Sequence, residues 1–323
     1  MSRYLVTGCA GFIASKTAEF LLADGHEVIG VDNLNEYYDV SLKHHRLDQL
    51  RPSGKFTFQK LDLEDAAGVH RLFEQHQFDA VVNLAARAGV RYSMENPHVY
   101  VTTNIIGSLN LLEAMRKHGV KKFVLASTSS LYAGQPMPFV ESLAVNTPIS
   151  PYAATKKGAE VMAYSYHQLH GIDCSVVRYF TVYGPAGRPD MSIFRFIKWI
   201  DQKHRLEVFG DGSQSRDFTY VDDIARGTIA AIKPVGYEII NLGGGNQPVA
   251  LTTIIEKLET LLGKKANIDN EPFHAADIKA TWADISKAAK LLSWRPTISL
   301  DEGLARTVDW YKANQPWSGS IKL

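Results

Sequence analysis

The fold is decided by the stretch Tyr4-Leu5-Val6-Thr7-Gly8-Cys9-Ala10-Gly11-Phe12-Ile13-Ala14-Ser15, in which a glycine-rich turn joins an apolar run to an apolar helical segment. Gly8 and Gly11 permit a tight turn and a close approach of the backbone to a pyrophosphate at the helix N-terminus. The third glycine of the usual pattern is replaced by Ala14, at a position where a methyl group can often be accommodated. The stretch predicts a dinucleotide-binding turn formed by Gly8, Gly11 and the Phe12-Ile13 step.

Short β-branched runs alternate with helical segments through the first half of the chain. The predicted strands are 4–7, 28–32, 56–59, 80–84, 123–127 and 174–178, and the predicted helices are 12–23, 66–75, 100–118 and 152–170. Most of the strands are apolar throughout, as expected when both faces of a sheet are covered. This alternation predicts an α/β fold with a Rossmann-type doubly wound parallel sheet.

The regular alternation of strands and helices ends after the segment 183–189. The later segments 192–203, 238–242, 252–262, 286–292 and 300–311 are smaller and less regular. We therefore expect an NAD-binding Rossmann domain over 1–184 and a mainly substrate-binding α/β portion over 185–323. Parts of 219–245, notably 219–232, are candidates to pack back against the main sheet.

Composition points to an ordinary globular protein with a small-molecule partner. The 323 residues are 45% hydrophobic and 21% charged, with a formal net charge of +1, so nothing suggests a nucleic-acid or anionic-membrane surface. The chain has only two cysteines, Cys9 and Cys174, and no apolar run approaches the roughly 20 residues of a membrane span. We expect a cytoplasmic protein with no metal site, no nucleic-acid partner and no membrane partner.

Polar residues at the ends of the predicted strands suggest which dinucleotide is bound. Asp32 ends the second strand, where a carboxylate can accept hydrogen bonds from the adenosine ribose, and the following Asn33-Leu34 supplies no cation for a 2′-phosphate. NAD is therefore favoured over NADP. Asp62-Leu63 and Asn83-Leu84-Ala85-Ala86 follow the next strands at the same sheet edge. Each of these could contact the cofactor or simply cap a turn.

A proton-transfer pair is predicted at the start of the segment 152–170. Tyr152 and Lys156 lie four residues apart, hence on one face of the helix, and a neighbouring ammonium favours the tyrosinate form. The preceding strand ends in the hydroxyl-rich Ser127-Thr128-Ser129-Ser130, one member of which can hydrogen-bond a substrate hydroxyl. The Tyr/Lys spacing could arise by chance, and the hydroxyl groups could simply cap turns. The catalytic interpretation is favoured because the glycine-rich turn, the acidic strand end, the hydroxyl cluster and the Tyr/Lys pair occur in one consistent order.

In that order the motifs resemble those of the extended short-chain dehydrogenase/reductases that act on nucleotide sugars. The resemblance covers nearly the whole chain, through Arg178-Tyr179-Phe180-Thr181-Val182-Tyr183-Gly184-Pro185, Phe209-Gly210-Asp211-Gly212, Arg216-Asp217-Phe218 and Trp282-Ala283-Asp284. Within that superfamily it is closest to the UDP-glucuronate 4-epimerases, through Ala88-Gly89-Val90-Arg91-Tyr92-Ser93 and Gly187-Arg188-Pro189-Asp190-Met191. Two positions depart from the pattern: Ala133 replaces a usual glycine, and His274 a frequent arginine.

The resemblance implies roles for individual residues. Thr128, Tyr152 and Lys156 would be catalytic, and Asn104 and Tyr179 would join the cofactor residues already named. Substrate-binding residues would be Arg91, Ser129, Ser130, Thr181, Arg188, Phe209, Arg216 and Asp277, with Arg216 and Asp277 at the nucleotide end. The segments 100–118 and 152–170 resemble the helices of the family's dimer, so we expect a homodimer.

The implied reaction is C4 epimerisation of a UDP-hexuronic acid through a transient 4-keto sugar. Related 4,6-dehydratases carry Asp-Glu after the threonine, whereas Ser129-Ser130 here cannot act as a comparable acid or base. Arg188 offers a planar donor fork for a uronate carboxylate, with Ser129, Ser130 and Thr181 as neutral partners. Arg91 is equally suited to a cofactor phosphate or an ion pair.

Three other functions remain open at this stage. A UDP-glucose or UDP-N-acetylglucosamine 4-epimerase would have Arg188 facing elsewhere, and a UDP-glucuronate decarboxylase would lose C6 after oxidation at C4. A non-catalytic sensor of NAD or nucleotide sugars could use the same fold. Thr128, Tyr152 and Lys156 argue against the sensor, because binding alone needs no proton-transfer pair.

Overall fold

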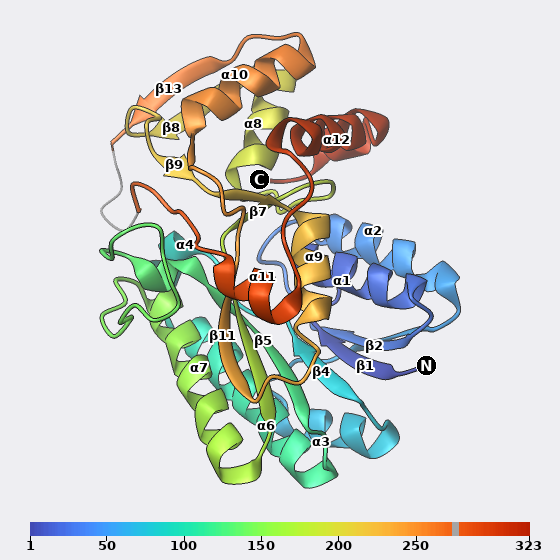
Figure 1. The fold of residues 1–323 in the computed structure, drawn as a ribbon. Helices are drawn as coiled ribbons and strands as arrows, with labels where there is room; N and C mark the ends of the chain where they lie inside the picture. The colour runs from blue at the N-terminus through green and yellow to red at the C-terminus, as the bar shows by residue number, and fades with distance from the viewer. Residues whose placement is uncertain (273–277) are drawn as a thin grey trace.

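A computed structural model describes residues 1–272 and 278–323, and these residues build a seven-stranded sheet with the strand order β11-β6-β5-β4-β1-β2-β3 (Figure 1). Every neighbouring pair in this sheet is parallel. The strands are β1 (Arg3–Thr7), β2 (Glu27–Asp32), β3 (Phe56–Lys60), β4 (Ala80–Asn83), β5 (Lys122–Thr128), β6 (Asp173–Tyr179) and β11 (Tyr237–Leu242). The predicted Rossmann-type fold is confirmed.

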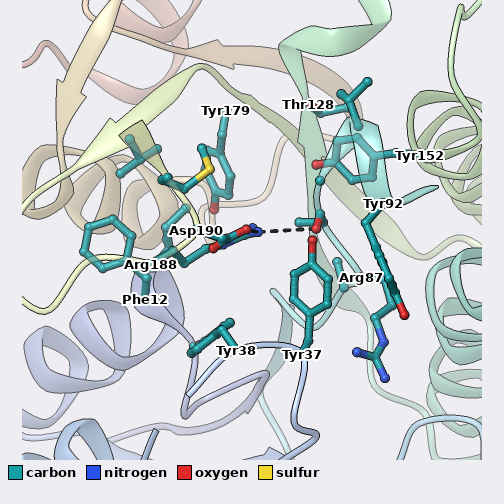
Figure 2. A pocket seen from close by; sticks show the side chains of 18 of the residues that line it. Phe12, Tyr37, Tyr38, Arg87, Tyr92, Thr128, Tyr152, Tyr179, Arg188 and Asp190 are labelled. Atoms are coloured by element: carbon teal, nitrogen blue, oxygen red, sulfur yellow. Dashed lines mark hydrogen bonds and ion pairs between the residues drawn. The ribbon is translucent and has the colours of Figure 1, made fainter. Parts of the chain in front are cut away.

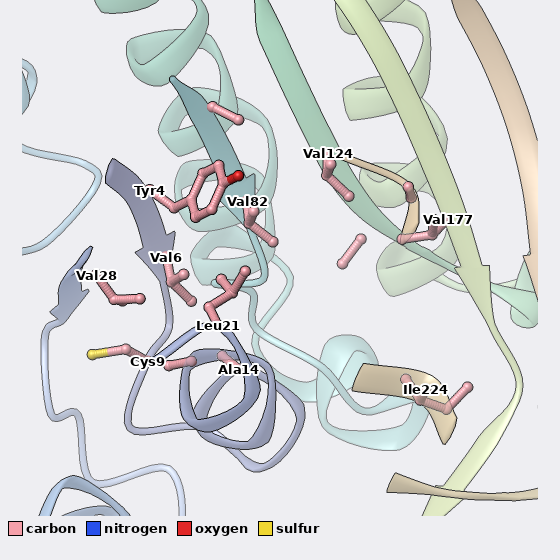
Figure 3. Close-up of a cluster of buried hydrophobic side chains, with 14 of the residues drawn as sticks. Tyr4, Val6, Cys9, Ala14, Leu21, Val28, Val82, Val124, Val177 and Ile224 are labelled. Carbon is pink, nitrogen blue, oxygen red and sulfur yellow. The ribbon is translucent and has the colours of Figure 1, made fainter. Parts of the chain in front are cut away.

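Helices cover both faces of the sheet. One layer holds α1 (Phe12–Ala23), α2 (Val40–Leu50), α9 (Val221–Ala230) and α11 (Ser286–Leu292), and the other α3 (Ala66–Gln75), α6 (Gly107–His118) and α7 (Pro151–His170). Successive strand residues point to opposite layers: Val6 packs with α1 and α9, whereas Leu5 packs with α3 and α6. Figure 3 shows the first of these two cores. This arrangement explains why the strands are apolar at nearly every position.

A smaller apolar core lies beyond the carboxyl edge of the sheet. It is built by α8 (Ser192–Asp201), β8 (Arg205–Phe209), α10 (Leu251–Leu262) and α12 (Leu300–Ala313), with β13 (Asn267–Glu271) parallel to β8. Two small ladders lie nearby: β7 (Thr181–Tyr183) pairs with β10 (Phe218–Tyr220), and β9 (Ser215–Arg216) with β12 (Val249–Ala250). Shorter helical elements are α4 (Val90–Glu95), α5 (His98–Tyr100), α13 (Trp317–Ser320) and the 3₁₀ turns Arg51–Ser53 and Ser129–Tyr132.

Two helical regions differ from the sequence-based prediction. The helix predicted over 100–118 is interrupted, because a π-helical stretch, Val101–Ile106, precedes α6. Helix α2 was not predicted at all. Its buried face includes the charged residues Lys43 and Arg46 beside Leu42 and Leu47, which breaks the apolar periodicity that identifies an amphipathic helix.

The structure accommodates two of the sequence departures, at Ala14 and Ala133. Ala14 is buried in the contact between α1 and the sheet, so its methyl group is part of the packed core. Ala133 has φ −51°, a value open to every residue, and the left-handed position belongs to Gly134 with φ +80°. His274 lies outside the described residues.

Candidate active site

A cavity of about 730 Å³ extends along the carboxyl edge of the sheet and reaches the smaller core (Figure 2). Open parallel sheets bind ligands at this edge. The predicted residues that line it are Gly8, Gly11, Phe12, Ile13, Asp32, Asn33, Asp62, Leu63, Leu84, Ala85, Ala86, Arg91, Thr128, Ser129, Ser130, Tyr152, Lys156, Tyr179, Thr181, Arg188, Phe209 and Arg216. The fold thus brings most of the predicted site residues to one cavity.

The glycine-rich turn lies tightly against the end of β4. Gly8 has φ +67°, and a Cβ atom there would lie 2.8 Å from the Cα of Ala85. The amide of Gly11 donates to the carbonyl of Gly8 at 2.7 Å, and α1 begins at the next residue without a side-chain cap. Only glycine fits this approach, and the first N–H groups of α1 are left for an anion. This cradle fits the pyrophosphate of a dinucleotide.

The acidic strand ends meet at one corner of the cavity. The Oδ1 atom of Asp32 accepts a hydrogen bond from the Leu34 amide at 2.8 Å and lies 3.7 Å from the buried Nζ of Lys43. Asn33 donates to Asp62 at 2.8 Å. Asn33 and Leu34 supply no cation here, but Lys43 of α2 does, and Asp32 engages it. The corner is therefore partly neutralised within the chain.

Helix α7 carries the Tyr/Lys pair at the start of its first turn. Ser150 caps the helix by accepting a hydrogen bond from the Ala153 amide at 3.2 Å, and Pro151 occupies the first helical position. This cap starts the helix directly before Tyr152. Thr128, the last residue of β5, lines the same cavity, and its hydroxyl acts to lower the pKa of Tyr152. The phenol, a threonine hydroxyl and the cavity are therefore adjacent (Figure 2).

Burial governs the protonation of both members of the pair. Burial raises the pKa of Tyr152, while the hydrogen bond with Thr128 and the charge of Arg188 act in the opposite direction. Burial also lowers the pKa of Lys156 to about 8, against the charge of Glu160 one turn farther along α7. Burial therefore opposes the tyrosinate form that the sequence predicts for Tyr152 and the ammonium form of Lys156.

Arg188 reaches the cavity already paired. Its Nε atom donates to Asp190 Oδ1 at 3.0 Å, and its Nη2 donates to Asp190 Oδ2 at 2.5 Å and to the Ala88 carbonyl at 3.3 Å. The guanidinium also lies 5.7 Å from the ring centroid of Tyr37. Burial alone would lower the pKa of Arg188, but Asp190 raises it well above its ordinary value. Arg188 is therefore a fixed cation at the cavity wall.

The other predicted substrate residues lie on short elements around the smaller core. The guanidinium of Arg91 lies 3.7 Å from the ring centroid of Phe209, and Arg216 donates to the carbonyls of Ser215 and Lys279 at 2.9 and 3.3 Å. Thr181 begins β7. Arg91 of α4 thus meets residues after 180 at the end of the cavity next to the smaller core, which suits a substrate approaching from that side.

Two predicted residues are placed differently. In the described part of the chain, Asn104 is not among the residues that line the cavity; its amide donates to the Arg87 carbonyl at 3.0 Å and accepts from the Arg87 amide at 2.9 Å. It therefore shapes the loop after β4. Asp277 lies outside the described residues.

Sequence reasoning missed several residues of the cavity wall, namely Tyr37, Tyr38, Lys43, Arg87, Asp190 and Arg195. Tyr37 and Tyr38 come from the loop before α2, and in Figure 2 they face Arg188. Arg87 lies 5.8 Å from the Tyr37 ring centroid. The available signal was the aromatic pair Tyr37-Tyr38 directly after a strand end that was itself assigned to the cofactor.

Within residues 1–272 and 278–323, no cluster of three His, Cys, Asp or Glu side chains is placed to hold a metal ion. Across the same residues, no helix combines the length and the apolar character needed to cross a membrane.

Comparison with known proteins shows the family. Residues 5–307 match the family described as GDP-mannose 4,6 dehydratase. The chain is 62% identical over 323 residues to a UDP-glucuronate 4-epimerase of Thermodesulfobacterium geofontis, which covers all of both chains. It is 39% identical over 333 residues to a probable UDP-glucuronate 4-epimerase of Rhizobium meliloti, covering 97% of each.

Solved structures agree with this relationship. The UDP-glucuronic acid 4-epimerase of Bacillus cereus, in complex with UDP-glucuronic acid and NAD, is 39% identical with a TM-score of 0.91, covering 96% of this chain and 99% of that chain. The UDP-glucose 4-epimerase of Thermotoga maritima with UDP-glucose is 32% identical with a TM-score of 0.87, covering 96% and 99%. The chain therefore belongs to the GDP-mannose 4,6 dehydratase family of extended short-chain dehydrogenase/reductases.

Proposed function

We propose that this protein is an NAD-dependent isomerase that interconverts UDP-glucuronate and UDP-galacturonate at C4. The observation that carries the proposal is one cavity that joins the dinucleotide turn, the group Thr128, Tyr152 and Lys156, and the buried cation Arg188. The relative at 62% identity, named a UDP-glucuronate 4-epimerase, supports the same reaction.

The residues present fit NAD. The cradle between Gly8 and Ala85 leaves no room for a side chain, and Asp32 with Asn33 offers hydrogen-bond partners for ribose hydroxyls. NAD supplies reversible hydride acceptance when bound, and its cationic nicotinamide lowers the cost of a nearby phenolate. The solved relatives in complex with NAD support this cofactor.

Tyr152 handles the proton in the proposed reaction. Its phenolate accepts the proton of the C4 hydroxyl as that carbon is oxidised, and the phenol returns a proton when the 4-keto sugar is reduced on its other face. Thr128 stabilises the developing negative charge by hydrogen bonding at the same oxygen. Lys156 contributes its ammonium charge below its pKa of about 8. Tyr152 therefore ends each turnover in the protonation state in which it began.

Arg188 binds the sugar carboxylate and keeps C6 in place. Asp190 and the Ala88 carbonyl engage Nε and Nη2, so Nη1 is the nitrogen that the guanidinium offers to the substrate. Ser129, Ser130 and Thr181 line the same cavity and provide neutral hydrogen bonds. Ser129 and Ser130 stand where dehydratases of the family carry an acid pair, which supports epimerisation over elimination.

The proposal is tested by incubating purified protein with UDP-glucuronate, without added NAD, and identifying the product. UDP-galacturonate supports it; a UDP-pentose indicates carbon loss, and activity on UDP-glucose alone indicates a neutral-sugar epimerase. In Arg188→Ala, activity on UDP-glucuronate should fall far more than activity on UDP-glucose. The control is Arg205→Ala, whose side chain is 70% exposed and lies on β8 beside Asp269. Equal losses on both sugars in Arg188→Ala would reject carboxylate recognition by this residue.

The proposal includes a homodimer formed through α7 and the neighbouring helical stretch 100–118. Exposed apolar side chains project from these neighbouring segments: Val101, Ile106, Val161, Tyr164 and Leu169. A dimer that covers them would explain their exposure. Light scattering should show that the parent protein is a dimer and that Val161→Glu shifts it toward monomer. A monomeric parent would contradict the proposed dimer.

Two further parts concern domains and location. We assign NAD binding to residues 1–184 with parts of 219–245, and most of the sugar-nucleotide contacts to 185–323, because β11 extends the sheet whereas β8 and Phe209 belong beside the smaller core. Cys9 and Cys174 are free and buried, which supports a cytoplasmic location. Fractionation of the native host tests the location.

A further inference from the structure

Arg46 of α2 is a buried cation that the proposed reaction does not use. Its residue is 3% exposed, and among the described residues it is not one that lines the cavity. Its guanidinium nevertheless donates five hydrogen bonds. It also lies 6.0 Å from the ring centroid of Phe12 and 5.5 Å from that of Tyr38. A fully engaged buried arginine of this kind fixes the segments whose oxygen atoms it binds.

One of the five bonds stays close in sequence, from Nη1 to the Tyr38 hydroxyl at 2.7 Å. The other four end on backbone carbonyls of two distant parts of the chain. Nη1 donates to the carbonyl of Ala10, inside the dinucleotide turn, at 3.0 Å. Nε and Nη2 donate to the carbonyl of Ala186 at 3.0 and 2.7 Å, and Nη2 donates to that of Gly187 at 3.2 Å. The second segment directly precedes Arg188. One side chain therefore ties the cofactor turn to the turn that presents the proposed carboxylate donor.

The turn that Arg46 holds is locally strained. Ala186 has φ +50°, a left-handed conformation that is unfavourable for a residue other than glycine. Such a residue persists when its surroundings fix it. Two of the five donated hydrogen bonds end on the carbonyl of this same residue. Without them the backbone before Arg188 would be able to relax toward an ordinary conformation.

We propose that Arg46 is a positioning residue that sets sugar selectivity by holding the 186–187 turn against the dinucleotide turn, so that Arg188 faces the substrate carboxylate. In Figure 2, Phe12 and Tyr38, the two rings beside Arg46, lie on the same side of the cavity as Arg188. The proposal rests on the proposed function, because it concerns the same carboxylate. It assigns the role to the bridge between two segments and not to the charge alone.

The test measures a ratio of affinities. In the Tyr152→Phe background, which prevents turnover, NAD-saturated protein is titrated calorimetrically with UDP-glucuronate and with UDP-glucose. Arg46→Met should lower the preference for UDP-glucuronate by about tenfold, the order expected when a charge-assisted hydrogen bond is misaligned. UDP-glucose, which has no carboxylate, should bind nearly as in the parent.

Two more variants keep the result decisive. Arg46→Lys retains the positive charge, but a single ammonium cannot span Ala10 and Ala186, so the ratio should fall there too, and this variant decides if Arg46→Met does not fold. Lys198→Met removes another buried cation, which donates to the Ile321 carbonyl away from the cavity, and should leave the ratio unchanged.

The outcomes separate this inference from the proposed function. An unchanged ratio in Arg46→Lys, or equal weakening of both ligands in the folded Arg46 variants, overturns the inference and indicates a merely structural role. If the protein with Tyr152 intact does not epimerise UDP-glucuronate, the proposed function fails first, and the ratio has no bearing on catalysis.

Discussion

Replacing Glu160 by Gln should destabilise the protein strongly, because Glu160 of α7 forms a buried ion pair with Arg178 of β6. Its side chain is 1% exposed, as is that of its partner Arg178. Arg178 donates to Oε1 and Oε2 of Glu160, each at 2.8 Å, and Ser127 donates to Oε1 at 2.6 Å. The remaining Nη1 of Arg178 donates to the Tyr132 hydroxyl at 2.8 Å.

The size of the effect follows from this burial. A glutamine has one acceptor oxygen and an amide that would face the donors of Arg178, so the guanidinium loses its countercharge without access to water. Removing one partner of a buried pair costs about 3–5 kcal/mol of the free energy of unfolding. That is a large fraction of the roughly 5–15 kcal/mol that holds a typical protein folded.

Urea unfolding of the parent and variant measures this loss. The matched control is Glu113→Gln: Glu113 accepts from Arg116 Nε and Nη2 at 3.0 and 2.8 Å, but these side chains are 33% and 38% exposed. An exposed pair contributes about 0–1 kcal/mol, so the control should change little. In Glu160→Gln with Arg178→Met, part of the stability should return, because the guanidinium is no longer buried without its countercharge. Equal losses for Glu160→Gln and Glu113→Gln would refute the reasoning.

The same substitution should shift the pH profile of the enzyme. Burial lowers the pKa of Lys156 to about 8, and the charge of Glu160 opposes that effect. Without Glu160 the pKa of Lys156 falls further, so the ammonium form is lost at a lower pH. The alkaline limit of kcat/KM should therefore move down in Glu160→Gln and remain in place in Glu113→Gln. A limit that stays fixed in both would separate Lys156 from the pH dependence.

Three further predictions concern the cofactor turn, the phenol and a buried carboxyl. Gly8→Ala should fold but lose NAD affinity by about tenfold or more in a fluorescence titration, because the new methyl group would lie 2.8 Å from the Cα of Ala85; an unchanged Kd contradicts the cradle. Tyr152→Phe should keep its circular dichroism spectrum and lose nearly all turnover, whereas near-normal turnover would remove Tyr152 from the chemistry. Burial raises the pKa of Asp217 to about 6 although the amides of Ala283 and Gly245 donate to it, so its contribution to stability is present below about pH 4 and lost as pH rises through about 6. The free energy of unfolding of Asp217→Asn, taken relative to that of the parent, should therefore be higher at about pH 7.5 than at about pH 4, by up to about 3 kcal/mol. If the free energies of unfolding of the two proteins changed in parallel with pH, this prediction would be excluded.

Local signals made the sheet and much of the cavity predictable. Gly8 and Gly11 mark the turn in four residues of sequence, and Tyr152 with Lys156 share a helix face wherever that helix packs. The carboxyl ends of parallel strands meet at one edge, so Asp32, Asn33 and Thr128 could be grouped without coordinates. These inferences needed only short-range geometry and the topology of the sheet.

The residues that escaped prediction depend on contacts between distant segments. Lys43 and Arg46 are charged yet buried, and their oxygen partners come from Asp32, Ala10 and Ala186, so their positions give α2 a polar pattern. The engagement of Arg188 by Asp190 depends on how a single turn bends. Strands as short as β7 and β10 give too few residues for an alternating pattern.

The π-helical stretch Val101–Ile106 makes the floor of the site sensitive to chain length. A wider turn of this kind holds one residue more than the ordinary winding, and each residue of an α-helix rotates the chain by roughly 100°. Deleting any single residue there would restore regular winding and turn Asn104 away from Arg87, whose backbone it holds from both sides. In homologues and engineered variants, a one-residue insertion or deletion in this stretch would therefore detach the loop after β4 from its anchor.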